Sequence, residues 1–185
     1  MSNQPSLETN RLLLRPFSLN DAAGVQRLAG DYDVASTTLR IPHPYEDGIA
    51  EQWIETHATA YAKGNSATFA IELKSTREFV GGIALVIFRG ANRGELGYWV
   101  GKPYWGQGIC TEATRAVLGY AFNELKLNRV SAEHMTRNPG SGRVMQKVGM
   151  KYEGTLRQNL KKWDRYEDMV VYGILSSEFS ASPVV

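Results

Sequence analysis

The chain has 185 residues with 21 basic and 19 acidic side chains, so its net charge of +2 gives no overall electrostatic field of the kind that attracts nucleic acid. A composition of 43% hydrophobic and 22% charged residues is typical of a folded globular protein and excludes a disordered one. The length predicts one domain, residues 1–185, with a core from about residue 8 to residue 175.

The first half of the chain predicts one strand, two helices and a hairpin. Residues 11–17 form the strand, which Pro16 closes. Apolar residues at helical spacing then predict helices over about residues 21–30 and 47–63. Two apolar, β-branched runs at residues 67–73 and 78–88 flank the polar stretch "KSTR" and predict a β-hairpin.

The second half predicts a strand over residues 95–101 and a helix over about 108–126. A strand at 128–135, a short helix at 138–150 and a hairpin of 151–160 with 166–175 follow, and residues 176–185 have the loop composition of a frayed tail. The order predicts a mixed α/β fold in which one βαβ crossover lies inside a hairpin-rich sheet. A ligand crevice is expected at the strand end that leads into the central helix.

Several classes of partner are excluded by these patterns. No basic run is longer than Lys161 and Lys162, which argues against nucleic acid. The longest apolar run, residues 83–88, is too short to span a bilayer, and the N-terminus lacks the apolar core of a signal peptide. The single cysteine, Cys110, excludes an internal disulfide and fits a reducing compartment. We therefore expect a cytoplasmic protein with no membrane partner.

A glycine turn, Gly106-Gln107-Gly108, directly precedes the long central helix. The start of a helix carries unpaired N–H groups and a partial positive charge, and glycine lets an anion approach them. The residues present exclude two known phosphate loops. A dinucleotide-binding fingerprint needs glycine at the position of Thr111, and a P-loop needs lysine at the position of Ile109. Taken alone, the turn fits either a phosphate site or a tight turn with no ligand.

The segment "WGQGIC", residues 105–110, resembles the acyl-CoA pyrophosphate loop of GNAT-type N-acetyltransferases, whose pattern is Gln/Arg-x-x-Gly-x-Gly/Ala. The chain is most similar to the RimJ/RimL-like family. Supporting stretches occur in the family's order between about residues 8 and 175, namely "ETNRLLLRP", "IPHPYEDGIAEQWI", "ELGYWVGKPYWGQGICTEA", "NPGSGRVMQKVGM" and "KWDRYEDMVVYGIL". Two departures are Trp105 in the Gln/Arg slot and Cys110 in the Gly/Ala slot.

This resemblance implies the GNAT acyl-CoA N-acyltransferase fold, with a mostly antiparallel central sheet splayed at the cofactor site. It implies acetyl-CoA as donor and a primary amine as acceptor. The cofactor-binding residues that it implies are Tyr98, Trp99 and Val100 for the pantetheine arm, Gly106, Gln107, Gly108, Ile109, Cys110 and Thr111 for the pyrophosphate, and Asn138 near the thioester. Arg143, on the helix after Asn138, fits either a positive charge near the phosphates or a solvated helix face.

Two residues are candidates for catalysis. Glu95 is the candidate general base, acting directly or through water, with an exposed carboxylate beside a hairpin loop as the alternative. Ser141 takes the slot from which the family protonates the departing thiolate, but it also fits a helix-start serine. Tyr98 is its nearest competitor for this acid role. Cys110 has no nearby histidine, which favours small-residue packing over a covalent acyl-enzyme.

On the acceptor side, the resemblance implies that His43 and Tyr45 line the substrate pocket and that Tyr166, in the last hairpin, borders it. Packing is the alternative for Tyr166. His134 is expected to be structural, and neither His43 nor His134 has metal-ligand spacing with a partner, so no metal is expected.

The leading hypothesis is an acetyl-CoA-dependent N-acetyltransferase, and a sensor that binds acyl-CoA without turnover is the alternative. A protein N-terminal α-amine and a small amine both stay open as acceptor. The expected assembly is a monomer or a homodimer.

Overall fold

The structure is a computed structural model that describes residues 4–180. Within this range eight strands form one sheet in the order β1-β2-β3-β4-β5-β6-β8-β7. The strands are β1 (Leu7–Glu8), β2 (Leu12–Pro16), β3 (Ser66–Leu73), β4 (Phe79–Phe88), β5 (Arg93–Val100), β6 (Arg129–Met135), β7 (Lys151–Lys162) and β8 (Arg165–Leu175). The α-helices are α1 (Ala22–Ala29), α2 (Tyr32–Thr37), α3 (Ile49–Ala62), α4 (Ile109–Gly119) and α5 (Pro139–Lys147). None of the helices in residues 4–180 has both the length and the apolar character needed to cross a bilayer.

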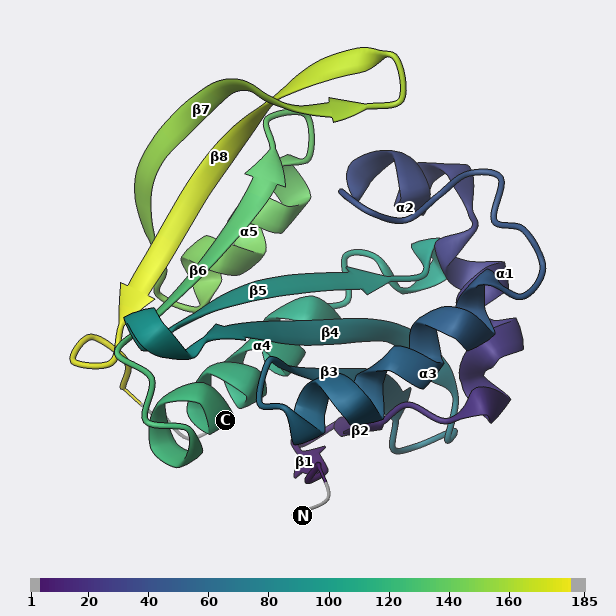
Figure 1. Cartoon of the computed structure of the whole chain (residues 1–185), viewed down its shortest axis with the longest axis horizontal. Helices are drawn as coiled ribbons and strands as arrows, with labels where there is room; N and C mark the ends of the chain where they lie inside the picture. Colours follow the sequence, from purple (N-terminus) through teal and green to yellow (C-terminus); the bar gives the residue numbers. More distant parts are fainter. Residues whose placement is uncertain (1–3, 181–185) are drawn as a thin grey trace.

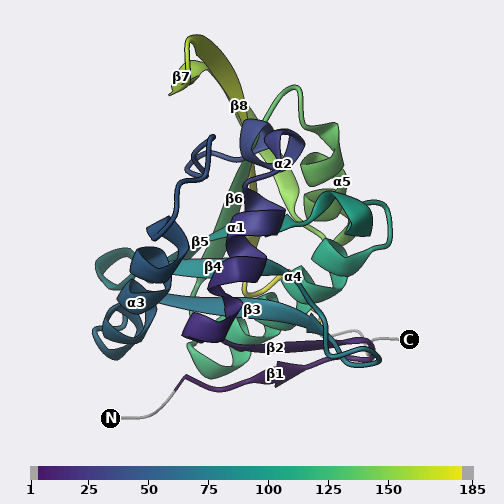
Figure 2. The ribbon, with the colours of Figure 1, turned by 90° about the vertical axis from the view of Figure 1, so that its right-hand side faces the viewer.

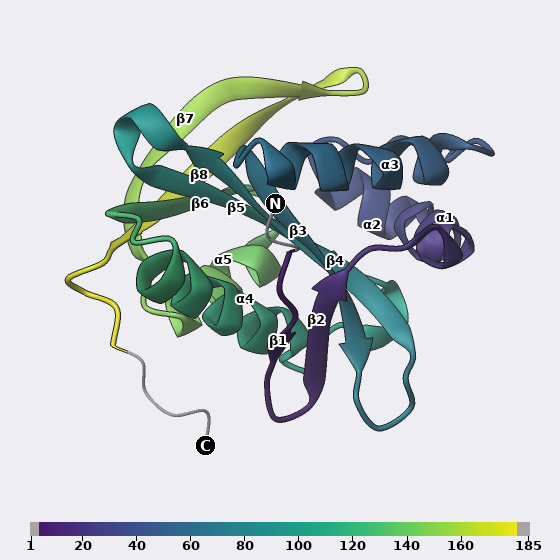
Figure 3. The same cartoon turned by 60° about the horizontal axis from the view of Figure 1, so that its bottom comes forward.

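The helices lie on both faces of the sheet. Figure 3 shows α3 on one face, with α4 and α5 on the other, and Figure 2 shows α1 in front of the strands, on the side nearest the viewer. Neighbouring strands run antiparallel except β5 and β6, which are parallel and are joined through α4. The predicted mixed α/β fold and its single βαβ crossover are therefore confirmed.

The sheet opens between β5 and β6. Their pairing ends where Leu96 faces Ala132. Beyond that point β5 continues to pair only with β4, and β6 only with β8. Figure 1 shows the two strands diverging. Because strand pairing stops there, the last residues of β5 present backbone groups to an open wedge instead of to a neighbouring strand.

Two apolar clusters hold the layers together. The larger one lies between the sheet and α4 and contains Leu12, Phe69, Leu85, Ile109 and Val117, all at most 2% exposed. The smaller one lies under α1 and α3 and is built from Val25, Ala29, Ala50 and Ile54, with Trp53 and Trp99 packed against it. The sheet is thus covered on both faces around the wedge, so the wedge has rigid walls.

An ion network ties β2 to the turn before α1. Two guanidinium nitrogens of Arg15 donate to the two carboxylate oxygens of Asp21, each at 2.8 Å, and Nε donates to Glu72 at 2.8 Å. The side chains of Asp21 and Glu72 are 6% and 5% exposed. Burial alone would raise the pKa of Asp21, but hydrogen bonds from Arg15 and Ser18 outweigh it and lower that pKa. Arg15 therefore compensates two buried negative charges.

The structure differs from the sequence prediction in three segments. The short strand β1 and the helix α2 were not expected. Asp31 caps the start of α2, and its side chain accepts from the N–H of Asp33 at 2.8 Å. The predicted frayed tail is wrong for residues 176–180, because Phe179 packs against Phe122 with ring centroids 5.2 Å apart. Residues 181–185 of that prediction lie outside the described residues.

His57 on α3 is expected to make stability depend on pH. It is 9% exposed, its ring contacts Phe17 and Trp53, and burial lowers its pKa to about 4. The unfolded chain, with a histidine pKa near 6.5, therefore binds a proton in the interval where the folded chain does not. Stability should fall as the pH drops from about 6.5 towards 4, by about 3 kcal/mol in total. Urea unfolding of the protein and of His57→Phe over this pH range measures the effect. If the free energy of unfolding changed equally with pH in both proteins, the assignment to His57 would be contradicted.

Candidate active site

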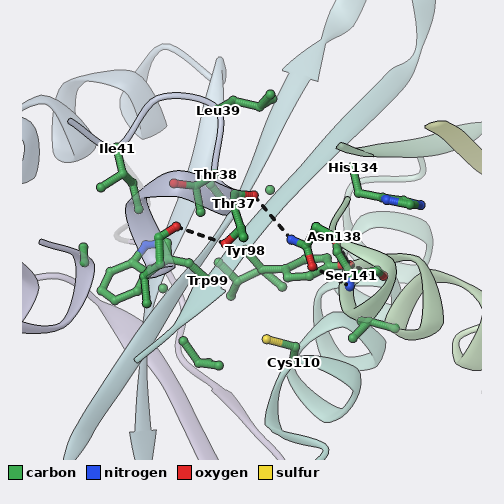
Figure 4. A pocket seen from close by; sticks show the side chains of 18 of the residues that line it. Thr37, Thr38, Leu39, Ile41, Tyr98, Trp99, Cys110, His134, Asn138 and Ser141 are labelled. Carbon is green, nitrogen blue, oxygen red and sulfur yellow. Dashed lines mark hydrogen bonds between the residues drawn. The ribbon is translucent and has the colours of Figure 1, made fainter. Parts of the chain in front are cut away.

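A cavity of about 1000 Å³ lies at the wedge between β5 and β6. One wall is formed by the start of α4 and by α5, and the other by α1, α3 and residues 37–42. Figure 4 shows Trp99 and Ile41 towards one side, and Asn138 and Ser141 towards the other. The predicted crevice at the strand end that leads into the central helix is therefore present.

The glycine turn forms one end of this cavity. Gly106 and Gly108 have φ values of +74° and +77°, which residues with a Cβ rarely adopt. A Cβ built on Gly106 would meet no atom within 4 Å, so the turn is open to an approaching group. No side chain caps α4, and its first N–H groups have no intrahelical partner. These features fit an anion such as a diphosphate.

The turn is held in place by side chains from both sides. The indole N–H of Trp105 donates to the carbonyl oxygen of Val100 at 2.9 Å. Arg11, just before β2, donates to the carbonyl of Gln107 at 3.1 Å, and its Nε donates to Glu112 at 2.7 Å. Arg11 and Glu112 were not identified from the sequence, because 101 positions separate them. Trp105, one of the two departures from the family pattern, is thus part of the support of the turn.

Tyr98 and Ser141 meet inside the cavity. The Tyr98 hydroxyl lies 3.0 Å from the Ser141 hydroxyl, and it donates to the Ser141 carbonyl oxygen at 3.0 Å. Burial raises the pKa of Tyr98 well above its usual value, so this phenol keeps its proton at neutral pH. Burial likewise raises the pKa of Cys110 to about 12. A thiol in that state is a weak nucleophile, in keeping with a packing role.

Residues 36–41 run along the mouth of the cavity, and side chains from the opposite wall hold their carbonyl groups. Arg137 donates to the carbonyl of Ser36, Asn138 to that of Thr37 at 3.3 Å, and Lys162 to that of Ile41 at 2.6 Å. We call residues 36–41 the strap. The Asn138 amide is therefore already engaged with the protein, since its oxygen also accepts from the Ser141 N–H at the start of α5. Figure 4 shows the bond to Thr37.

Two carboxylates lie at the point where β5 and β6 part. Glu95 and Glu133 both line the cavity, and neither forms an ion pair with a described residue. Burial and the charge of Glu95 raise the pKa of Glu133. Glu95 could be identified from the sequence, but Glu133 could not, because its proximity to Glu95 depends on how β5 and β6 pair.

Most of the predicted site residues line this cavity, and three do not. The lining includes Tyr45, Glu95, Tyr98, Trp99, Val100, Gly106, Gly108, Ile109, Cys110, Thr111, Asn138, Ser141 and Arg143. His43 instead contacts Tyr32 and Trp163, Tyr166 is 61% exposed, and the Gln107 side chain donates to the Pro103 carbonyl. The predicted placement of His43 and Tyr166 on the pocket is thus not what the structure shows.

His134 is held by contacts with its neighbours in the protein. His134 is 9% exposed, and its Nδ1 lies 2.8 Å from the carbonyl oxygen of Met135. Its ring also stacks on Tyr172, with centroids 5.9 Å apart. Among residues 4–180 there is no group of three or more His, Cys, Asp or Glu side chains suited to a metal ion.

Comparison with known proteins identifies the family. The acetyltransferase (GNAT) domain matches residues 11–151. The chain is 34% identical over 177 residues to the probable N-acetyltransferase YjcK of Bacillus subtilis, covering 93% of this chain and 98% of that protein. The chain belongs to the GNAT acetyltransferase family. It is therefore an acyltransferase enzyme, and the sensor hypothesis is not favoured.

Solved structures agree with this GNAT assignment. A GNAT-family acetyltransferase from Bacillus anthracis is 28% identical with a TM-score of 0.83, covering 94% of this chain and 100% of that one. RimJ of Mycobacterium smegmatis, solved in complex with CoA-disulfide, is 25% identical with a TM-score of 0.87, covering 97% and 91%. The GNAT fold and the RimJ/RimL-like resemblance predicted from the sequence are confirmed.

Proposed function

We propose that this GNAT enzyme transfers the acetyl group of acetyl-CoA to a primary amine. The observation that carries the proposal is the uncapped start of α4, preceded by an open glycine turn, at one end of a cavity that sits where β5 and β6 part. The RimJ relative in complex with CoA-disulfide supports a CoA thioester as donor. Bound acetyl-CoA would supply the activated acetyl group.

The chain's own residues fit the donor at several points. The first N–H groups of α4 and the turn Gly106–Gly108 bind the diphosphate. Arg143 lines the same wall and Lys147 lies one helical turn farther along α5; both are exposed and form no ion pair with a described residue, so they add positive charge. Tyr98 and Ser141 form a hydroxyl pair that donates a proton to the departing thiolate.

The donor site is tested by a substitution in the glycine turn. Gly106→Val should weaken binding of CoA about tenfold or more, because a β-branched residue is strained at a φ of +74° and its side chain would project beside the N–H groups of α4. Calorimetry with CoA and with acetyl-CoA measures it. Gly90→Val is the matched control, since a Cβ there also meets no atom within 4 Å and the residue lies in a remote turn. Equal affinities for all three proteins would contradict the site.

Glu95 is proposed as the general base that takes the proton from the amine, directly or through water. Glu95→Gln should lower kcat/KM for the amine about a hundredfold near neutral pH, while CoA affinity stays within about twofold. Thiol release from acetyl-CoA across pH 6 to 9 is the measurement. A rate profile that is unchanged at every pH removes Glu95 from the mechanism.

A further inference from the structure

The cavity is electrostatically divided. The wall formed by α4 and α5 carries Arg143, Lys147 and the positive end of α4. The region where β5 and β6 part carries Glu95 and Glu133. Arg93 and Arg129 border the same two glutamates in a smaller pocket, where Arg129 pairs with Glu153 and Arg93 lies over the ring of Phe88. One end therefore suits the phosphates of the donor, and the other suits a cation. An acceptor amine approaches the enzyme as an ammonium ion, so the carboxylates are placed to recognise it before it loses its proton.

Strand register places the two carboxylates on the same face. Glu95 pairs with Ser131, and Glu133 follows two positions later on β6, so the alternation of side chains returns it to that face. The effect of the Glu95 charge on the pKa of Glu133 shows that the two interact. Two like charges that share a site repel each other, and a cation between them relieves the repulsion.

Beyond these carboxylates the cavity wall towards α1 and α3 is mostly apolar, with Arg40 and Arg137 as charged members of the lining. The lining on the α1 and α3 side includes Val25, Ala29, Ile41, Pro42, Tyr45, Ile49, Trp53 and Trp99. Several of them, Trp53 and Trp99 among them, pack on the smaller apolar cluster, which keeps their rings in place. The Trp99 ring also contacts Phe79, with centroids 6.0 Å apart. This half of the cavity can bury an apolar group, but it would have few partners for the charges of a molecule that carries several of them.

An independent polar group lies among these walls. Thr68 on β3 lines the cavity, is 6% exposed, and its hydroxyl has no hydrogen bond to any side chain or backbone group of residues 4–180. The hydroxyl is not enclosed by protein atoms, so it is free to bond to a group inside the cavity. In the sheet, Thr68 pairs with Ala84 on β4, and Ala84 pairs with Gly97 on β5, the strand that carries Glu95. A ligand here would gain one hydrogen bond as well as the two carboxylates.

We propose that the acceptor is a monoamine: a primary amine with one positive charge, joined to an apolar body such as an aromatic ring. Its ammonium lies between Glu95 and Glu133, and its body lies against Trp99. The proposal rests on the proposed function and narrows its acceptor. A polyamine would place further charges against the apolar walls, and an amine that also carries a carboxylate would be repelled by the two glutamates.

Three amines on the unaltered protein test this. Phenethylamine has the proposed features, L-phenylalanine has the same ring and amine with an added carboxylate, and spermidine carries several charges. Binding of each to the protein with saturating CoA is measured by calorimetry, and thiol release from acetyl-CoA is measured in parallel. Phenethylamine is expected to bind at least tenfold tighter than either of the others, and to react fastest. A preference for spermidine or L-phenylalanine overturns the proposal.

Glu133→Gln then tests the second carboxylate. It should weaken phenethylamine binding about tenfold, with CoA affinity unchanged as the sign of an intact fold. Glu55→Gln is the matched control, since Glu55 is exposed on α3 and does not line the cavity. Phenethylamine binding without thiol release would support this inference and contradict the proposed function. Thiol release confined to the other amines would support the proposed function and contradict this inference. An absence of any phenethylamine binding also overturns the inference.

Discussion

Tyr98→Phe is expected to lower kcat for acetyl transfer about a hundredfold, with little change in the affinity for CoA. The Tyr98 hydroxyl lies 3.0 Å from that of Ser141, inside the cavity, and burial raises its pKa so that it holds a proton that it can donate. Removing one oxygen atom removes the donor while the ring continues to fill its space. Thiol release under saturating substrates measures the effect.

Tyr61→Phe is the control for this substitution. Its hydroxyl lies 3.3 Å from the Tyr120 hydroxyl, outside the cavity lining, so the same chemical change should leave kcat within about twofold. Ser141→Ala separates the two members of the pair. If Ser141→Ala abolishes turnover and Tyr98→Phe does not, the serine is the proton donor and the tyrosine only orients it.

Arg15→Met is expected to destabilise the fold by about 3 kcal/mol at neutral pH. The substitution leaves Asp21 buried without its cation, and Glu72 keeps only Arg77, whose Nε lies 2.8 Å away on an exposed side chain. Removing one partner of a buried ion pair costs more than the pair contributes, because a charge is left uncompensated. Urea unfolding followed by circular dichroism gives the free energy.

The pH dependence of this variant identifies the cause. Arg15 and Ser18 lower the pKa of Asp21, so the stabilisation is present above the ordinary aspartate pKa and is lost as the pH falls through the lowered one. The difference between the two proteins should therefore shrink below about pH 4. Lys74→Met removes an exposed ion pair with Glu8 and should cost less than about 1 kcal/mol. A loss for Arg15→Met that is independent of pH points to lost packing instead.

The elements with strong local signals could be predicted from the sequence. The apolar spacing of α3 and α4, the hairpin of β3 and β4, and the turn at Gly106 and Gly108 each depend on residues that are neighbours along the chain. The glycine turn was the most informative, because positive φ values and an uncapped helix start serve both local geometry and anion binding.

The rest depends on contacts between distant parts of the chain. Glu133 approaches Glu95 only because β5 and β6 pair in one register. The helix α2 is six residues long, has two threonine or serine residues at its end, and is stabilised by its neighbours more than by its own propensity. The position of His43 also depends on distant contacts. The sequence of a loop between two prolines does not determine the direction of the His43 side chain, and in the structure its ring packs on Tyr32.

The strap and the start of α5 are joined through a single side chain. The strap carbonyl at Thr37 is held by Asn138, and the same Asn138 side chain accepts from the N–H of Ser141. The hydroxyl of that same Ser141 lies 3.0 Å from the hydroxyl of Tyr98. One amide side chain thus connects the strap with the residue whose hydroxyl faces Tyr98, so a substitution at Asn138 would remove a contact on both sides of the cavity.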